Sequence, residues 1–309
     1  MNIKDKLKTL QLLSGKTQAE LALLLGVTTL AFSNWWNGKS LPRKNALRKI
    51  DGALLKYGIS DSVKSIKNES GLSIQKRAVF SIAKKHRNIF KKIISRTDLV
   101  DELSLQITYN SNAIEGSTLT REDAKNVIFE NKVLGNKTLI EQLEAKNHDK
   151  AFRYLLKSLE NKEQVGELLV KKLHKILLAG IRDDAGMYRS DAVRIVGSYV
   201  PTANHIKVPD LMKKLFTEKF AEKDTLNRVS RFHANFEKIH PFADGNGRVG
   251  RLLMIGILLY SDMAPAIITK KRRPEYYKAL QQAELHENFN PIENFICEAV
   301  LEGYKIIGE

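Results

Sequence analysis

The sequence has little cysteine: Cys297 is the only one among 309 residues. A single thiol excludes an intramolecular disulfide, and the sequence has no cluster of cysteines and histidines that would indicate zinc. Long apolar runs are also missing, because none reaches the ~18 residues that a membrane-spanning helix needs. Residues 1–8 lack the apolar core of a secretion signal. We therefore expect a cytoplasmic protein without a membrane partner.

Acidic residues are scarce in the first third of the chain. Residues 1–100 hold 20 lysines and arginines against 6 aspartates and glutamates, whereas residues 101–309 hold 31 against 29. Nearly all of the formal net charge of +16 therefore belongs to the N-terminal third. Such asymmetry predicts a nucleic-acid or other acidic partner for that third alone. The length predicts about two domains.

The N-terminal residues 1–57 have the pattern of short helices joined by tight turns. Thr17 and Glu20 form a capping-box pattern at the start of a helix that we expect to end before Gly26. A second helix is expected over residues 28–36, ended by Asn37 and Gly38. A helix, a glycine turn and a second helix at this spacing form a helix-turn-helix unit. The pattern Thr-Gln-x-Glu-Leu-Ala…Gly…Asn-Gly-Lys resembles the Cro/XRE-like repressor type.

This resemblance implies that the second helix enters the major groove of DNA. The residues it assigns to base edges are Thr29, Leu30, Ser33 and Asn34. The residues it assigns to phosphates are Gln18, Lys39 and Arg43. Leu30 departs from the pattern, because repressors usually carry a polar residue there. The alternative use of such a unit is docking of a protein or formation of a homodimer.

The rest of the chain is predicted to be mainly α-helical. Residues 58–76 are rich in serine and glycine and are interpreted as a linker. Residues 77–98 read as one amphipathic helix with a basic face. Residues 192–196 form the clearest β-like run, and together with residues 205–209 they predict a β-hairpin.

The segment 240–251, His-Pro-Phe-Ala-Asp-Gly-Asn-Gly-Arg-Val-Gly-Arg, carries the densest chemistry in the chain. Gly245 and Gly247 lack a Cβ, so the backbone can turn several N–H groups toward one anion. The apolar run 248–260 predicts a buried helix, whose N-terminus would add a positive dipole end at that loop. Phe242 is interpreted as a core anchor. The loop is therefore predicted to bind phosphate groups.

The polar side chains of the same segment have complementary chemistry. His240 titrates near neutrality and is suited to take a proton from a hydroxyl. Asp244 is the lone carboxylate typical of a Mg²⁺ site that is completed by water and phosphate oxygens. Arg248 and Arg251 are three residues apart, share a helix face and are suited to bind successive phosphates.

The segment resembles the signature of the Fic/Doc family, His-x-Phe-x-Asp/Glu-Gly-Asn-Gly-Arg-x-x-Arg, with every fixed position matched. The resemblance implies a helical Fic domain over residues 77–309 that transfers AMP from ATP to a Tyr, Thr or Ser hydroxyl of a target protein, or of the enzyme itself. It makes His240 the base and Asp244 the Mg²⁺ ligand. The residues it assigns to ATP are Asp244, Gly245, Asn246, Gly247, Arg248 and Arg251, with Asn246 at the α-phosphate.

A second motif is Ser111-Asn-Ala-Ile-Glu115-Gly116. Ser111 and Glu115 are four residues apart and share a helix face, and Gly116 is a natural helix end. The motif resembles the inhibitory helix of the family, which is predicted here near residues 99–116. By that resemblance Glu115 pairs with Arg251 and takes the place of the γ-phosphate. ATP would then bind with its α-phosphate misplaced, which costs orders of magnitude in rate.

Two further regions resemble parts of the family site. The predicted hairpin resembles the flap, which places Val196 and Gly197 near ATP and offers an edge to an extended target segment. Tyr276 and Tyr277 match tyrosines that help to form the adenine pocket. Glu284 stands where some relatives carry an asparagine.

Two other functions remain open from the sequence. Some members of the family transfer a phosphate or phosphocholine, or remove AMP again with the glutamate positioning water. Gly247 argues against the phosphate-transferring branch, which tends to have lysine there. The non-enzymatic alternative is a DNA-binding transcription regulator whose Fic core senses a nucleotide.

Overall fold

The computed structural model describes residues 3–14, 16–58, 73–193, 200–217 and 224–308. The chain divides into two compact units, residues 1–87 and residues 88–308. Helix accounts for 71% of the described residues. In the described ranges no helix is long and apolar enough to cross a membrane.

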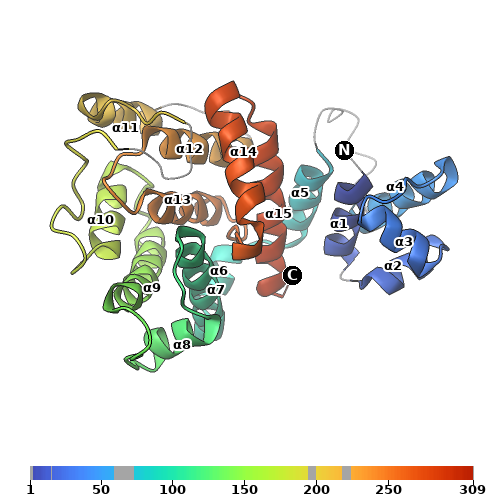
Figure 1. Ribbon diagram of the computed structural model, residues 1–309, viewed down its shortest axis with the longest axis horizontal. Helices are drawn as coiled ribbons and strands as arrows, with labels where there is room; N and C mark the ends of the chain where they lie inside the picture. The colour runs from blue at the N-terminus through green and yellow to red at the C-terminus, as the bar shows by residue number, and fades with distance from the viewer. Residues whose placement is uncertain (1–2, 15, 59–72, 194–199, 218–223, 309) are drawn as a thin grey trace. The chain divides into compact units, whose positions relative to one another are not determined.

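The smaller unit is built from five helices in its described part (Figure 1). They are α1 (Ile3–Ser14), α2 (Gln18–Leu25), α3 (Thr29–Trp36), α4 (Lys44–Gly58) and α5 (Ile74–Lys85). Thr17 caps α2 as the sequence predicts, because its side chain accepts the Glu20 N–H while the Glu20 carboxylate accepts the Thr17 N–H at 2.7 Å. Gly26 ends α2 in the left-handed region at φ 63°. Buried apolar side chains form the core of this unit: Leu7, Leu10, Leu21, Leu25, Phe32, Trp35, Ile50 and Leu54.

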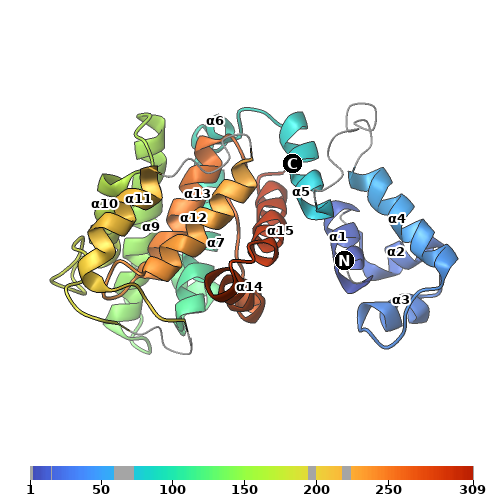
Figure 2. The ribbon, with the colours of Figure 1, turned by 90° about the horizontal axis from the view of Figure 1, so that it is seen from above.

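The larger unit is a helical assembly around α13 (Figures 1 and 2). Its first helices are α6 (Ile89–Ile94), α7 (Thr97–Glu115), α8 (Arg121–Phe129), α9 (Leu139–Glu160) and α10 (Glu167–Leu177). They are followed by the short turn η1 (His205–Lys207), α11 (Val208–Thr217), α12 (Thr225–Ile239) and α13 (Asn246–Tyr260). The last are η2 (Lys270–Arg272), α14 (Arg273–His286) and α15 (Asn290–Ile306).

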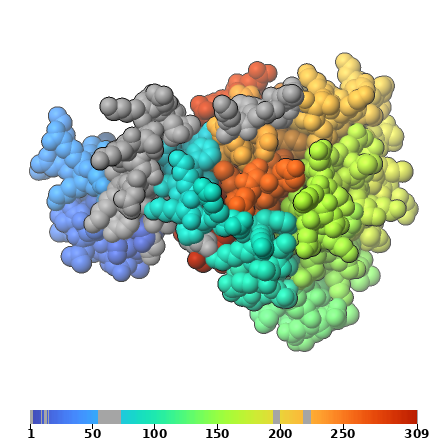
Figure 3. All heavy atoms as spheres, turned by 180° about the vertical axis from the view of Figure 1, so that it is seen from behind, coloured from blue at the N-terminus to red at the C-terminus, as the bar shows by residue number. Residues whose placement is uncertain are grey.

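Helix α13 is the helix predicted from the apolar run 248–260, and it is buried along nearly its whole length. It contacts α6, α7, α9, α10 and α12. The C-terminal end of α13, at Tyr260, reaches the surface. Its orange atoms lie between the teal region of α6 and α7 and the lime-green region of α9 (Figure 3). Because so many helices pack on α13, residues at its N-terminus meet side chains from distant parts of the sequence.

The β-hairpin predicted for residues 192–209 is not confirmed. No strand occurs in the part of the chain that the model describes, and residues 194–199 lie outside that part. The second predicted strand is wrong, because His205–Lys207 forms a 3₁₀ turn that leads into α11. The Asn204 side chain accepts the Ile206 N–H at 3.0 Å and starts this turn. A local side-chain cap thus decides against the extended conformation that the β-branched residues favour.

The single helix predicted over residues 77–98 is also wrong. Helices α5 and α6 occupy most of this stretch and α7 begins at its end, and the chain between α5 and α6 passes through Asn88 in the left-handed region at φ 59°. The Asp262 carboxylate, at the end of α13, accepts the N–H groups of Asn88 at 2.7 Å and Phe90 at 3.3 Å. This carboxylate satisfies the free donors at the start of α6, so a contact across 174 residues fixes where the helix begins.

Candidate active site

The loop before α13 is closed by the side chain of Asn246. Its Oδ1 accepts the Phe242 N–H and its Nδ2 donates to the Phe242 carbonyl, both at 2.8 Å. Gly245 precedes the helix at φ 77°, a conformation that strains any residue with a Cβ. Asn246 is 2% exposed, and its polar atoms bind within the loop. The role predicted for it at the α-phosphate stays a prediction.

His174 on α10 packs against this loop and holds it in place, a role that sequence reasoning missed. Its Nδ1 accepts the Gly186 N–H at 2.7 Å, so the ring donates from Nε2 to the Asp244 carbonyl at 3.0 Å. Burial lowers the pKa of His174 to about 4, which keeps the ring neutral and in this tautomer. The ring also stacks on Phe242 at a centroid distance of 3.7 Å, and Phe242 is the buried anchor that the sequence predicts.

His240 follows the last turn of α12 and lies in the left-handed region at φ 52°. Its Nδ1 lies 3.3 Å from the Glu237 carbonyl, which can only accept, so Nδ1 carries the proton and Nε2 is left with a free lone pair. Burial lowers the pKa of His240, although the Glu237 carbonyl acts in the opposite direction. The ring is therefore neutral at neutral pH and can accept a proton at Nε2.

Arg189 holds the backbone around His240, a role that sequence reasoning missed. Its buried guanidinium donates to the carbonyls of His240 and Asp191, both at 2.7 Å, and to that of Ala203. Its N–H donates to the Pro241 carbonyl at 3.0 Å. Arg189 thereby links the backbone of His240 to Asp191, just before the segment in which the flap was predicted, and to Ala203 within that segment. The only signal in the sequence is the position of this arginine three residues before the β-like run.

Arg251 makes the contact with Glu115 that the sequence predicts. Its Nη2 donates to Glu115 Oε1 at 2.7 Å, while Nε donates to Ser111 Oγ at 2.9 Å and Nη2 to the Ser111 carbonyl at 3.0 Å. The Arg251 side chain is 4% exposed and that of Glu115 is 35% exposed. A Cβ added at Gly247 would lie 2.3 Å from Glu115 Oε1. The carboxylate therefore lies directly over the first turn of α13, where the anion-binding N–H groups are expected.

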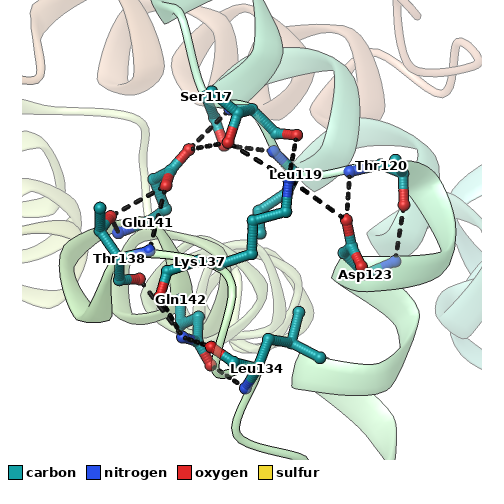
Figure 4. A network of polar contacts seen from close by, with 10 residues as sticks. Ser117, Leu119, Thr120, Asp123, Leu134, Lys137, Thr138, Glu141 and Gln142 are labelled. Carbon is teal, nitrogen blue, oxygen red and sulfur yellow. Dashed lines mark hydrogen bonds and ion pairs between the residues drawn. The ribbon is translucent and has the colours of Figure 1, made fainter.

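The chain after Glu115 is fixed to α9 by a network of polar contacts (Figure 4). The N–H and the hydroxyl of Thr118 both donate to Glu141 Oε1, at 2.6 and 2.8 Å. The bond from the Thr118 N–H is the largest cause that lowers the pKa of Glu141, to about 2. Lys137 Nζ donates to the Thr118 carbonyl at 2.8 Å. The end of α7 is thus held at a fixed place relative to α9.

Arg248 binds two carboxylates. Its Nη1 lies 2.5 Å from Glu144 Oε1 on α9, and its Nη2 lies 3.5 Å from Asp244 Oδ1. Asp244 Oδ1 also accepts the Gly245 N–H at 2.6 Å. The Arg248 side chain is 4% exposed, whereas that of Asp244 is 52% exposed. Glu144 was not singled out from the sequence, because a glutamate on an amphipathic helix carries no signal of its partner.

The surroundings of Asp244 fit a metal site in which the substrate supplies some of the ligands. Among the described residues, no group of three or more His, Cys, Asp or Glu side chains could hold a metal ion. A half-exposed carboxylate at the N-terminus of α13 fits Mg²⁺ held jointly by one aspartate, water and phosphate oxygens. It does not fit a metal held by protein ligands alone.

The two tyrosines predicted to form the adenine pocket differ in environment. Tyr276 is 1% exposed, and its hydroxyl lies 2.6 Å from His233 Nε2, so it is largely a core residue. Tyr277 is 38% exposed and remains available to a ligand. Glu284 is buried, and burial raises its pKa to about 7. Val196 and Gly197, also predicted to contact ATP, lie outside the described residues.

In the smaller unit, helix α3 presents the residues assigned to base edges. Phe32 and Trp35 point into the core, while Thr29 and Leu30 are exposed and Ser33 and Asn34 are partly exposed. Leu30 is 71% exposed. Lys39 and Arg43 are exposed, and Gln18 is partly exposed. These side chains are accessible to a ligand.

The chain is similar in sequence to known proteins over about two thirds of its length. The chain is 31% identical over 219 residues to "Protein adenylyltransferase Fic" of Nematostella vectensis, covering 66% of this chain and 49% of that protein. It is 29% identical over 202 residues to the protein of the same name from Drosophila virilis, covering 64% of this chain and 41% of that protein. The chain spans about half the length of these relatives or less.

Solved structures agree on the fold. A Fic family protein from Desulfovibrio desulfuricans is 26% identical with a TM-score of 0.61, covering 76% of this chain and 74% of that one. A structure of Fic-1 from C. elegans is 24% identical with a TM-score of 0.63, covering 85% of this chain and 82% of that one. Residues 165–258, which include His240 and both motif arginines, match the model of the Fic/DOC family. This part of the chain is therefore a Fic/DOC family domain.

Proposed function

We propose that the protein is an adenylyltransferase that transfers AMP from ATP to a hydroxyl side chain of a target protein, and that Glu115 inhibits it. The observation that carries this proposal is the Glu115–Arg251 pair at 2.7 Å, set over Gly247 in the segment that begins with the neutral His240. A carboxylate placed on an anion-binding helix N-terminus mimics the phosphate that this position is built to hold. The relatives named protein adenylyltransferase support the same chemistry.

The proposed reaction is an in-line substitution at the α-phosphorus. His240 Nε2 takes the proton of the target hydroxyl as its oxygen bonds to the α-phosphorus. The bond from that phosphorus to the bridging oxygen of the β-phosphate breaks, and pyrophosphate leaves. The backbone N–H groups at the start of α13 and the guanidinium of Arg251 stabilise the charge on the phosphate oxygens. Asp244 would hold Mg²⁺, which would neutralise part of the triphosphate charge when bound.

The proposed inhibition follows from competition for Arg251. While Glu115 holds this guanidinium, a γ-phosphate cannot bind it in the same way, and the triphosphate must adopt another path over α13. The α-phosphate is then displaced from the attacking hydroxyl, which removes most of the rate advantage of a well-aligned complex. The exposed fraction of the Glu115 side chain, 35%, is consistent with a carboxylate that can be displaced.

The proposal is tested by following the label of ATP. The full chain, its Glu115→Gly variant and the double variant Glu115→Gly with His240→Ala are incubated with a cell lysate and ATP labelled at either the α- or the γ-phosphate. We expect protein-bound label from α-labelled ATP only, more of it with the Glu115→Gly variant, and none with the double variant. Label from γ-labelled ATP would mean phosphate transfer and would refute the assignment.

A second reaction at the same site is removal of AMP from a modified protein. This reaction would use the carboxylate of Glu115 to position a water molecule, and Glu115 is present here in the motif Ser111-Asn-Ala-Ile-Glu115-Gly116. Incubating an AMP-modified target with the unaltered chain and with the Glu115→Gln variant distinguishes the two directions. Release of AMP by the unaltered chain alone would make removal the main activity.

We further propose that the smaller unit binds DNA through α3. This rests on the excess of basic residues in the first 100 positions and on the accessible side chains of α3 and the turn after it. A gel-shift titration of the full chain on duplex DNA at increasing salt tests it, because neutralising phosphates makes binding weaken steeply with salt. Absence of salt-dependent binding would favour a protein-docking role. If DNA binding is found without AMP transfer, the chain is better described as a regulator whose Fic domain senses a nucleotide.

A further inference from the structure

Each of the two motif arginines is bound by a glutamate from another helix. Arg251 binds Glu115 of α7 at 2.7 Å, and Arg248 binds Glu144 of α9 at 2.5 Å. Both arginine side chains are 4% exposed, so both cations are nearly removed from water and depend on their partners. The second pair is part of no motif in the sequence and has no role in the proposed reaction above.

The two glutamates differ in what they cover. Glu115 is 35% exposed and lies over Gly247, on the path proposed for the triphosphate. Glu144 is 19% exposed, and the arginine that it holds reaches sideways to Asp244 Oδ1 at 3.5 Å. A phosphate can therefore replace Glu115 as the partner of Arg251. The contact of Glu144 with Arg248, in contrast, holds Arg248 next to Asp244.

Arg248 depends on Glu144 for its position. Its Nε is buried and has no hydrogen-bond partner in the described part of the chain, so the side chain is held by its terminal nitrogens. The short contact with Glu144 is charge-assisted, whereas the contact with Asp244 is a full ångström longer. Without Glu144, the guanidinium would retain only its longer contact and would turn toward the exposed Asp244 carboxylate.

We infer that Glu144 is a positioning residue for the metal-binding carboxylate: it holds Arg248 beside Asp244 and thereby fixes which oxygen of Asp244 stays free. Asp244 Oδ1 is already engaged by Arg248 and by the Gly245 N–H at 2.6 Å, so Oδ2 is the oxygen presented to a ligand. Groups that orient a metal ligand in this way typically contribute 10- to 100-fold to metal affinity or activity. The inference rests on the proposed use of Mg²⁺ and ATP.

The position of Glu144 on α9 strengthens the inference. Glu141 and Glu144 are three residues apart and share one face of this helix. Glu141 holds the chain after Glu115 through Thr118, and Glu144 holds Arg248. The first two turns of α9 therefore fix both the inhibitory glutamate and the proposed metal site, and a shift of this helix would move the two together.

The experiment replaces Glu144 by Gln in the Glu115→Gly background, with Glu160→Gln as the matched control. Glu160 ends the same helix, is exposed and touches no residue of the motif. Binding of Mn²⁺, as a spectroscopic substitute for Mg²⁺, is measured by electron paramagnetic resonance in the presence of a non-hydrolysable ATP analogue. The Mg²⁺ concentration for half-maximal AMP transfer and the melting temperature are measured alongside.

We expect Glu144→Gln to weaken Mn²⁺ binding and to raise the half-maximal Mg²⁺ concentration by about 10- to 100-fold. Glu144→Asp, which keeps the charge, is expected to recover part of this loss, and Glu160→Gln to leave all values unchanged. A lower melting temperature with unchanged metal affinity would overturn the inference, because the pair would then be only structural. Tighter binding of the ATP analogue would also overturn it, since Glu144 would then compete with phosphate as Glu115 does.

The metal-binding measurement also separates this inference from the proposed function. If the Glu115→Gly protein transfers no AMP but Glu144→Gln still weakens Mn²⁺ binding, the proposed reaction fails and the positioning role stands. If AMP is transferred and Glu144→Gln changes neither Mn²⁺ affinity nor the Mg²⁺ requirement, the positioning role fails alone.

Discussion

Replacing Glu115 by Gly is the most direct perturbation of the site. The substitution removes the carboxylate that accepts from Arg251 Nη2 at 2.7 Å and clears the space over Gly247. Arg251 keeps its bonds to Ser111 Oγ at 2.9 Å and to the Ser111 carbonyl at 3.0 Å. The guanidinium therefore remains placed in the site and is free to bind a phosphate.

The size of the effect follows from the contact that is lost. A hydrogen bond to a charged group contributes about 1.5–3 kcal/mol. ATP must supply this free energy when it displaces Glu115, and about 1.4 kcal/mol corresponds to a tenfold change in an equilibrium. We therefore expect AMP transfer to rise by about 10- to 100-fold in Glu115→Gly. Glu115→Gln keeps a neutral hydrogen bond of roughly half the strength and is expected to give a smaller rise.

The assay is the initial rate of AMP incorporation from α-labelled ATP at fixed target concentration, with Glu122→Gln as a control. Glu122 lies on the neighbouring helix α8 and its side chain is 68% exposed. Thermal melts establish that the variants are folded, since glycine near a helix end costs up to about 1 kcal/mol. Equal rates for the unaltered chain and a folded Glu115→Gly variant would refute the reasoning. A similar rise in rate with Glu122→Gln would mean that the loss of a nearby carboxylate is enough, and that the contact with Arg251 is not the cause.

Four further predictions concern the proposed base, the acid limb of the rate–pH profile, the stability of the fold at acid pH and one packing contact. His240→Ala should abolish AMP transfer while a titration of ATP analogue shows near-normal binding, because no described contact of the phosphate-binding loop depends on its ring; loss of binding would contradict this. Since burial lowers the pKa of His240, the acid limb of the rate–pH profile should lie below pH 6.5, and an acid limb above that value would be inconsistent with a buried neutral base. Three other histidines have pKa values lowered by burial to between about 3 and 4: His148, His174 and His233. The unfolded chain binds protons at these positions as the pH falls below about 6.5, whereas the folded chain does not. The free energy of unfolding, measured by chemical denaturation, should therefore be highest above pH 6.5 and fall as the pH drops toward 4, by up to about 1.4 kcal/mol per pH unit for each histidine. An unfolding free energy that does not change over this range would contradict the burial of these histidines. Gly303→Ala should lower the melting temperature strongly, because the added Cβ would lie 1.9 Å from the Pro265 carbonyl oxygen. An unchanged melting temperature would show that α15 can shift away from Pro265 without loss of stability.

The sequence predicts the parts of this protein whose signals are local. The cap at Thr17, the turn at Gly26 and the buried helix after Gly247 are each encoded within a few residues, and the model contains them all. The contact between Glu115 and Arg251 spans 136 residues, and it was predicted only because both motifs resemble parts of one family. Without that resemblance, Ser-x-x-x-Glu-Gly is an ordinary helix end.

The failures share a physical cause. The 3₁₀ turn at His205–Lys207 and the break at Asn88 depend on an individual polar side chain that satisfies backbone N–H groups. Periodicity measures which residues are apolar and carries no information about such partners. Residues that support the site from other helices, such as His174 and Glu144, are missed for the same reason.

The hydrogen bonds of the Arg189 guanidinium couple separate parts of the backbone. It joins the carbonyl of His240 to those of Asp191 and Ala203, two positions that are distant from His240 in the sequence. A displacement of the backbone at Asp191 or Ala203 is therefore passed to the backbone that carries the imidazole. Loss of the guanidinium is therefore expected to loosen the backbone position of the imidazole while leaving the ring itself unchanged.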